Sequence, residues 1–253
     1  MKLLAIDTAT ENCSAALLID GTLLFREVEM ERGHAERILP MIDELLSEAG
    51  LGLTDLNAIA FGRGPGSFTG VRLAATVTQG LAFGANLEVI PISDLQAVAQ
   101  RAFVTRPTPG RALVCNDARM SEVYWACYER GEDGLARLEG EEHVSRPSEV
   151  KLPPSWSTAI AVGRGFVAYG DALRHVLPQV PLGSPADSSV AAAAPVDNSL
   201  LRFLPHAREI AQLAVPELAA GRLLPPEGAV PIYLRDNVAH VARPPKPSGQ
   251  AGR

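Results

Sequence analysis

The chain has 253 residues, 47% of them hydrophobic and 5% aromatic, and its formal net charge at pH 7 is −6. An acidic chain with scattered Lys and Arg residues does not predict autonomous binding to nucleic acid, because phosphate neutralisation needs a basic patch. No apolar run approaches the ~20 residues of a membrane-spanning helix, and three cysteines without CxxC spacing are typical of a reducing cytoplasm.

The first part of the chain predicts a β-meander followed by alternating helices and strands. Asp20-Gly21 is a hairpin signal between two strand-like runs, and helical spacing of apolar residues begins after Gly33 and stops at Gly50. The predicted strands cover residues 2–7, 13–19, 22–29, 56–61 and 89–92, and the predicted helices cover 34–49, 69–85 and, capped by Ser93, 94–103.

Residues 106–110, Arg-Pro-Thr-Pro-Gly, change the composition and predict a boundary between residues 1–105 and residues 106–242. Beyond it, the predicted strands cover 112–115, 122–129, 135–144 and 158–162, the helices 168–177 and 204–220, a surface loop 183–199, an extended ending 231–235 and a disordered tail 243–253. Pro205 is expected in the first turn of the last helix. Whether that helix packs on the first lobe is left open. Because the opening hairpins make antiparallel edges, we expect a two-lobed α/β arrangement with mixed sheets.

A glycine-rich segment from Gly62 to Gly70 joins a predicted strand to a predicted helix. Free amide groups at such a helix start suit an anion such as phosphate. The segment lacks the Gly-Lys-Ser/Thr ending of a Walker A loop and the third glycine of the dinucleotide fingerprint. Phosphate or partner recognition and a tight structural connection between helix and sheet are both open interpretations.

Two further polar segments have a functional and a structural interpretation. Asp7-Thr8-Ala9-Thr10 ends the first strand, and we favour an ordinary turn over a catalytic phosphate site. Residues 116–120 form a polar tip that either faces the interlobe cleft or makes an Asx-type turn. His34 and Glu36 lack the spacing of a zinc helix, so the sequence predicts no metal site there.

Several motifs along the chain resemble those of the bacterial TsaB (YeaZ) family. They occupy residues 4–14, 33–40, 64–72, 117–124 and 231–235, and they include Gly-Pro-Gly-Ser-Phe-Thr-Gly-Val-Arg at the third place. The resemblance implies the two-lobed actin-like ATPase fold (ASKHA, ribonuclease H-like), with mixed sheets flanked by helices. It covers nearly the whole chain to Arg235.

The resemblance to TsaB implies a function without catalysis. Such a chain dimerises with TsaD, recruits TsaE, and supports threonylcarbamoyl transfer to the adenosine next to the anticodon of ANN-reading tRNAs. It contacts tRNA only through the complex, forms a homodimer when alone, and acts in the cytoplasm. ATP or ADP at the heterodimer junction is the one cofactor that the resemblance leaves open.

The resemblance also bears on single residues of a site. In TsaD a His-x-x-x-His pair binds the catalytic metal, and the corresponding positions here are Ser93 and Ala97, which cannot replace imidazole ligands. In the wider superfamily a first-strand aspartate approaches the nucleotide phosphates, although Ala9 stands where that turn has glycine. The candidates for nucleotide or phosphate binding are Asp7, Thr8, Thr10, Gly64, Gly66 and Ser67.

In this family the first two helices of the N-terminal lobe pair with the equivalent helices of a partner. The predicted interface residues are His34, Ile38, Leu39, Met41, Ile42, Leu45, Leu46, Phe68, Val71, Arg72 and Ala75. The first helix offers a wider apolar face than one sheet contact needs. The open question is whether an apolar strip remains once these helices have covered the chain's own sheet.

Two other classes of function compete with a scaffold. An active ATP-dependent kinase of a small metabolite, from the same superfamily, is the main alternative, and the missing glycine of the first turn argues against it. A peptidase is the other, but the sequence shows neither a GxSxG elbow nor HExxH zinc spacing.

Overall fold

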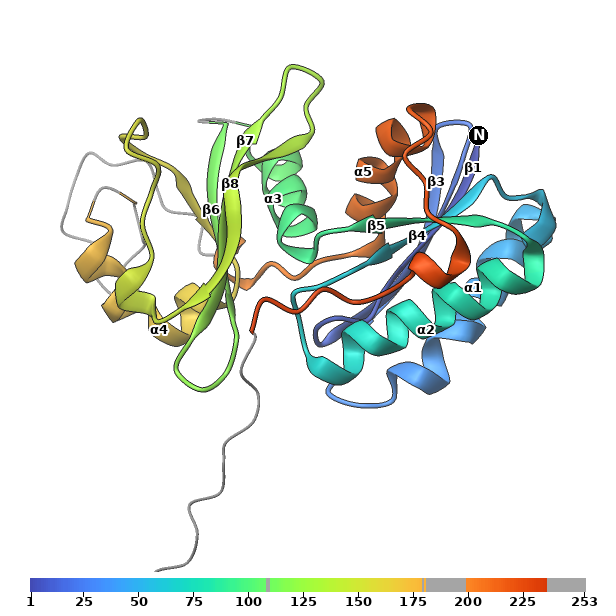
Figure 1. Ribbon diagram of the computed structural model, residues 1–253, viewed down its shortest axis with the longest axis horizontal. Helices are drawn as coiled ribbons and strands as arrows, with labels where there is room; N and C mark the ends of the chain where they lie inside the picture. Colours follow the sequence, from blue (N-terminus) through green and yellow to red (C-terminus); the bar gives the residue numbers. More distant parts are fainter. Residues whose placement is uncertain (108–109, 179, 181–198, 236–253) are drawn as a thin grey trace, which may run out of the picture.

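Two β-sheets organise the chain, and each gathers the strands of one half of the sequence (Figure 1). The computed structural model describes residues 1–107, 110–178, 180 and 199–235. The elements of the first half are β1 (Lys2–Asp7), β2 (Asn12–Ile19), β3 (Thr22–Glu29), α1 (His34–Ala49), β4 (Ala58–Gly62), α2 (Phe68–Ala85), β5 (Glu88–Ile92) and α3 (Asp94–Thr105). Those of the second half are β6 (Arg111–Asp117), β7 (Val123–Arg130), β8 (Ala136–Ser145), β9 (Ile160–Val162), α4 (Gly165–Val176) and α5 (Ala207–Ala219).

The first sheet is mixed, as the sequence predicts. Its strand order is β3-β2-β1-β4-β5, with antiparallel pairing of β1, β2 and β3 and parallel pairing of β1, β4 and β5. The hairpin between β2 and β3 turns at Asp20 and Gly21, which both have positive φ, as a type I′ turn requires.

Helices cover both faces of the first sheet. Successive residues of a strand point to opposite faces, and in β1 Leu4 and Ile6 join the core under α1 and α2, whereas Leu3 and Ala5 join the core that includes α3 and α5. The last helix, α5, therefore packs on the sheet of the first lobe although it follows the second sheet in the chain.

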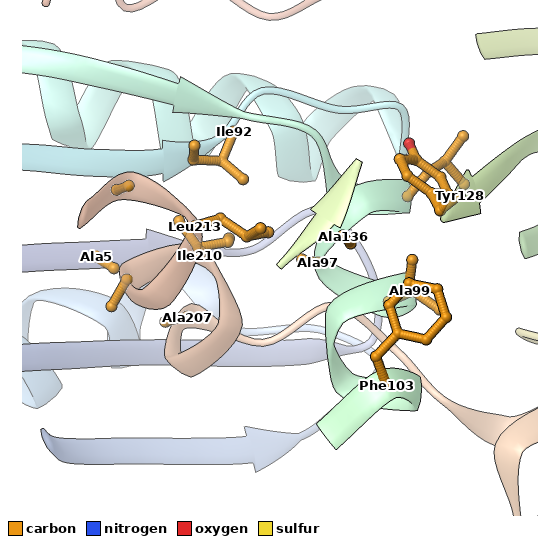
Figure 2. Close-up of a cluster of buried hydrophobic side chains, with 14 of the residues drawn as sticks. Ala5, Ile92, Ala97, Ala99, Phe103, Tyr128, Ala136, Ala207, Ile210 and Leu213 are labelled. Carbon is orange, nitrogen blue, oxygen red and sulfur yellow. The ribbon is translucent and has the colours of Figure 1, made fainter. Parts of the chain in front are cut away.

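The second sheet has the order β8-β7-β6-β9, with β6 antiparallel to β7 and parallel to β9. Helix α3 lies between the two sheets and packs on β6, β7 and β8, while α4 covers the other face. Figure 2 shows this shared core, in which Phe103 of α3 and Tyr128 of β7 lie beside alanines of both lobes. One continuous core thus joins the lobes.

Some boundaries differ from prediction. The last helix begins at Ala207, not at Leu204, so the placement of Pro205 in its first turn is wrong. His206 before the helix is extended, and the carbonyl of Pro205 accepts a hydrogen bond from Asn12 Nδ2 at 3.1 Å, which holds the proline outside. The predicted loop 183–199, except for Ser199, and the tail 243–253 lie outside the described residues. Among the helices that are described, none has the length and apolar character to cross a membrane.

Candidate functional site

The glycine-rich loop between β4 and α2 packs tightly on the turn that follows β1. A Cβ on Gly70 would lie 2.1 Å from the carbonyl oxygen of Thr8, and one on Gly66 would lie 2.6 Å from that of Ala9. The Thr8 hydroxyl donates to the Gly70 carbonyl at 2.7 Å, and the Ser67 amide donates to the Ala9 carbonyl at 2.7 Å. These contacts support the interpretation of the loop as a close structural connection.

This packing decides which phosphate candidates can meet a ligand. Asp7 and Thr8 are buried, with 0% and 1% of their surfaces exposed, and Asp7 Oδ1 accepts a hydrogen bond from the amide of Ala9 at 2.9 Å. A phosphate cannot reach these two side chains without a rearrangement. Thr10, Gly66 and Ser67, in contrast, line a cavity of about 310 Å³ between the lobes.

Gly64 is buried, and its φ of +100° is one that glycine adopts without strain. Its amide donates to Asp94 Oδ2, so it is occupied by the protein itself.

The polar tip between β6 and β7 reaches the same cavity from the second lobe. Asp117 Oδ1 accepts from the Arg119 amide at 2.8 Å, which is an Asx-type turn. The tip also lines the cavity, so the two interpretations of this segment are compatible. Beside it, Arg164 before α4 pairs with Glu11 at 3.2 Å and with Glu29 at 2.8 Å, and these ion pairs link the lobes.

The segment 231–235 crosses from one lobe to the other, where the sequence predicts no more than an extended ending. The amide of Ile232 donates to the carbonyl of Arg63 in the glycine-rich loop at 2.8 Å. Arg235 donates to the carbonyl of Ala118 at 3.1 Å and pairs with Glu122, both in the second lobe. The segment therefore forms one wall of the cavity.

The same segment completes an exposed cluster at the start of α2. The Arg72 guanidinium lies 3.5 Å from the centroid of the Phe68 ring, and Arg72 Nε donates to the Tyr233 hydroxyl at 2.7 Å. Phe68 and Tyr233 are 55% and 46% exposed. Leu39 of α1 is 49% exposed. We call Phe68, Arg72 and Tyr233 the α2 patch.

Most of the predicted interface residues lie inside the protein. The residues of this set that are buried are Ile38, Met41, Ile42, Leu45, Leu46, Val71 and Ala75. The expectation that α1 has a surplus apolar face is wrong, because that face packs on the chain's own sheet. His34 is half-buried, and its Nε2 lies 2.9 Å from the carbonyl oxygen of Thr10. Leu39, Phe68 and Arg72 remain available on the surface.

Ser93 and Ala97, which the resemblance aligns with metal-binding histidines, are buried by the packing around α3. Ser93 caps α3, accepting from the Gln96 amide at 3.3 Å, and donates to Glu142, while Ala97 is fully buried in the core. Glu142 also accepts from Tyr128 at 3.0 Å and from Arg63 at 3.1 Å. In the part of the chain that the structure describes, no three His, Cys, Asp or Glu side chains are grouped to hold a metal ion.

Comparisons with known proteins agree on one family. Residues 28–243 match the family model described as TsaD, tRNA N6-adenosine threonylcarbamoyltransferase. The chain is 41% identical, over 97% of its own length and 100% of the relative, to the tRNA threonylcarbamoyladenosine biosynthesis protein TsaB of Escherichia coli (strain K12). The TsaB of Haemophilus influenzae is 40% identical over 94% of this chain and 95% of that relative. The solved structure of YeaZ from Pseudomonas aeruginosa matches this one with a TM-score of 0.76 and 40% sequence identity, over 92% of this chain and 99% of that one.

Proposed function

The chain belongs to the TsaB (YeaZ) family of tRNA threonylcarbamoyladenosine biosynthesis proteins, and we propose that it serves this modification as a non-catalytic scaffold or activator subunit. In this role it pairs with a TsaD threonylcarbamoyltransferase, recruits TsaE, and meets tRNA only through the complex. The target is the adenosine next to the anticodon of ANN-reading tRNAs. It acts in the cytoplasm, together with its tRNA substrate.

The absence of catalysis is supported by what occupies the corresponding positions. Ser93 and Ala97 stand where TsaD has two metal-binding histidines, and both are buried in this chain's own packing. Asp7 and Thr8, which a kinase of this fold would direct at phosphates, are buried under the start of α2. The same burial disfavours the alternative of an active ATP-dependent kinase.

The observation that carries the partnership is the α2 patch. Interface hot spots are enriched in aromatic residues and arginine, and the α2 patch combines the two. A single exposed apolar side chain would not indicate an interface. Phe68, Arg72 and Tyr233 contact one another at the surface instead of packing into the core. The same patch serves as the homodimer contact when the chain is alone.

A nucleotide at the heterodimer junction is compatible with this arrangement. Helix α2 starts at the surface with Ser67 as its cap, next to the patch, and helix N-termini favour anions. ATP or ADP would then lie between the partners, not in contact with the buried Asp7.

Reconstitution tests the proposal. Purified chain, TsaD, TsaE, an activated threonylcarbamoyl donor and tRNA are combined, and modified adenosine is measured with and without the chain. We expect modification to depend on the chain. Equal modification in its absence would refute the scaffold. Calorimetry of the chain alone with ATP and Mg²⁺ separates the kinase alternative, which requires tight binding with turnover.

A matched pair of variants on one helix tests the surface. Phe68→Ala should weaken binding to TsaD by about 2 kcal/mol, roughly 30-fold, because it removes the centre of the patch. Phe83→Ala is the control, because Phe83 is 80% exposed near the other end of α2. Unchanged affinity of Phe68→Ala, or an equal loss in both variants, would contradict the assignment of the α2 patch.

A further inference from the structure

Two aspartates meet in the interior of the first lobe, beside the glycine-rich loop. Asp7 ends β1 and Asp94 opens α3, and neither side chain has any exposed surface. Gly62 separates them: a Cβ there would lie 2.5 Å from Asp94 Oδ1 and 2.7 Å from Asp7 Oδ1. Only glycine fits at this position, because any side chain would displace the two carboxyl groups.

Each carboxyl group holds the backbone of a different segment. Asp7 Oδ1 accepts from the amide of Ala9 in the turn after β1, at 2.9 Å. Asp94 Oδ2 accepts from the amide of Gly64 in the glycine-rich loop. The remaining oxygens, Asp7 Oδ2 and Asp94 Oδ1, receive no N–H or O–H group from any other described residue. The two carboxyl groups face each other across the space that a Cβ on Gly62 would fill, and they interact directly.

Two facing carboxylates in a dry interior repel each other, so the pair needs one positive charge. The positive charge that acts on Asp94 is that of Arg63, whose guanidinium is paired with Glu142 of β8 at 3.1 Å. Burial raises the pKa of Asp7 to about 6, and burial together with the charge of Asp7 raises the pKa of Asp94 well above its usual value. A carboxyl group that keeps its proton supplies the donor that the pair lacks.

Among the other charged groups on the surrounding elements, Glu209 of α5 is buried, and its Oε2 has no hydrogen-bond partner among the described residues. On the same face of the sheet, Arg101 of α3 bonds to His206, the residue before α5, and His206 also bonds to Glu27 of β3. On β2, the pKa of the Cys13 thiol is raised mainly by burial and further by the charge of Asp7. None of these groups donates to the two aspartates.

We propose that Asp7 and Asp94 share a single proton, carried by Asp94, and that this carboxyl pair is a pH-sensitive latch between the β1–β2 turn and the glycine-rich loop. One end of the latch fixes Ala9, and the other fixes Gly64, which leads into α2 and Phe68. Loss of the proton separates the carboxylates and loosens the loop. The latch is a property of the chain alone and does not rest on the proposed partnership.

Asp94→Asn tests the latch, because an amide can accept from Gly64 and donate to Asp7 without a titrating proton. Folding free energy is measured by urea denaturation from pH 5 to pH 9. Because both carboxyl pKa values are raised in the folded chain, the folded chain holds more protons than the unfolded one. The wild-type chain therefore loses stability as pH rises. Relative to Asp94→Asn, we expect its folding equilibrium constant to fall about tenfold per pH unit where one proton is at stake.

Asp43→Asn is the matched control, because Asp43 is exposed on α1. It should follow the wild-type pH profile. Parallel profiles for the wild type and Asp94→Asn would overturn the proposal. Infrared spectroscopy of the wild-type chain at pH 7 gives a second readout that does not depend on the variant folding. We expect a protonated carboxyl C=O band, and its absence would overturn the latch. Stoichiometric retention of a metal ion by the dialysed chain, lost in Asp94→Asn, would also overturn it, since a cation would then replace the proton.

Discussion

The two faces of the first sheet are covered by helix pairs of different character. Under α1 and α2 the sheet contributes large aliphatic and aromatic side chains, among them Leu4, Ile6, Leu17, Ile59 and Phe61. Under α3 and α5 it contributes alanines beside larger aliphatic residues, and its core continues into the second lobe; the sheet residues on this side are Ala5, Ala16, Ala58, Ala60, Leu3, Leu18, Ile90 and Ile92. Buried polar groups gather on this second side, including Asp94, Gln100, His206 and Glu209. The first face stabilises one lobe, whereas the second joins two lobes through a core that is richer in alanine and that adjoins buried polar groups.

The largest expected effect lies on the aliphatic face. Leu45→Ala should lower the free energy of unfolding by about 2–5 kcal/mol, because Leu45 of α1 is fully buried against the sheet and its loss leaves a cavity. Leu39→Ala on the same helix should change it by less than about 0.5 kcal/mol, since Leu39 is half exposed. Urea denaturation of both variants measures the contrast. Similar losses in both would mean that α1 does not distinguish a core side from a surface side.

The next effect concerns the polar face and depends on pH. Arg101 donates to His206 Nε2, and His206 Nδ1 donates to Glu27 Oε2 at 2.7 Å, so the buried ring is neutral. Burial, and then the charge of Arg101, lowers the pKa of His206 to about 4. The unfolded chain takes up this proton near pH 6.5 and the folded chain does not. Stability should therefore fall by up to about tenfold in the folding constant per pH unit between pH 6.5 and about 4.

His206→Gln isolates that contribution, because an amide side chain can accept from Arg101 and donate to Glu27 without titrating. Its stability should be less dependent on pH below 6.5 than that of the wild-type chain, measured by urea denaturation at pH 7, 6 and 5. His175→Gln, at an exposed position of α4, should keep the wild-type slope. If the stability of His206→Gln depended on pH as steeply as that of the wild-type chain, the loss of stability in acid would have another source.

The same contrast explains what the sequence could predict. Helical spacing placed α1 at residues 34–49 without error, because one face of a helix repeats regularly along the chain. The polar contacts have no such repeat: Asp7 meets Asp94, Asn12 meets Pro205, and the partners are distant in the sequence. Local sequence patterns cannot predict contacts between residues so far apart in the chain. They also could not place the segment 231–235 across the two lobes.

The candidate surface shows the limit of apolar spacing. Ile38 and Leu39 are neighbours of similar chemistry, yet one is fully buried and the other is half exposed. The spacing of the apolar residues predicted a helix, but it could not predict which of them would pack on the chain's own sheet. Phe68 was predicted from the family motif, and only its contacts with Arg72 and Tyr233 single it out as a surface feature.

The smallest expected effect comes from substitutions on the exposed side of α2. They test whether this side of the helix is free of contacts beyond the α2 patch. A Cβ on Gly80 would meet nothing within 4 Å, and Gly80 lies inside the helix at an exposed position. Gly80→Ala should therefore raise the free energy of unfolding by about 0.5–1 kcal/mol, through the lower backbone entropy of the unfolded chain and the better helix propensity of alanine. Thermal denaturation measures the gain, and Gly84→Ala, also without a neighbour within 4 Å, should reproduce it. Affinity for TsaD should not change in either variant, because the α2 patch lies at the start of the helix. If a variant gained stability but lost affinity for TsaD, the partner surface would extend along α2. The partner would then pack closely against the helix at the substituted glycine, outside the α2 patch.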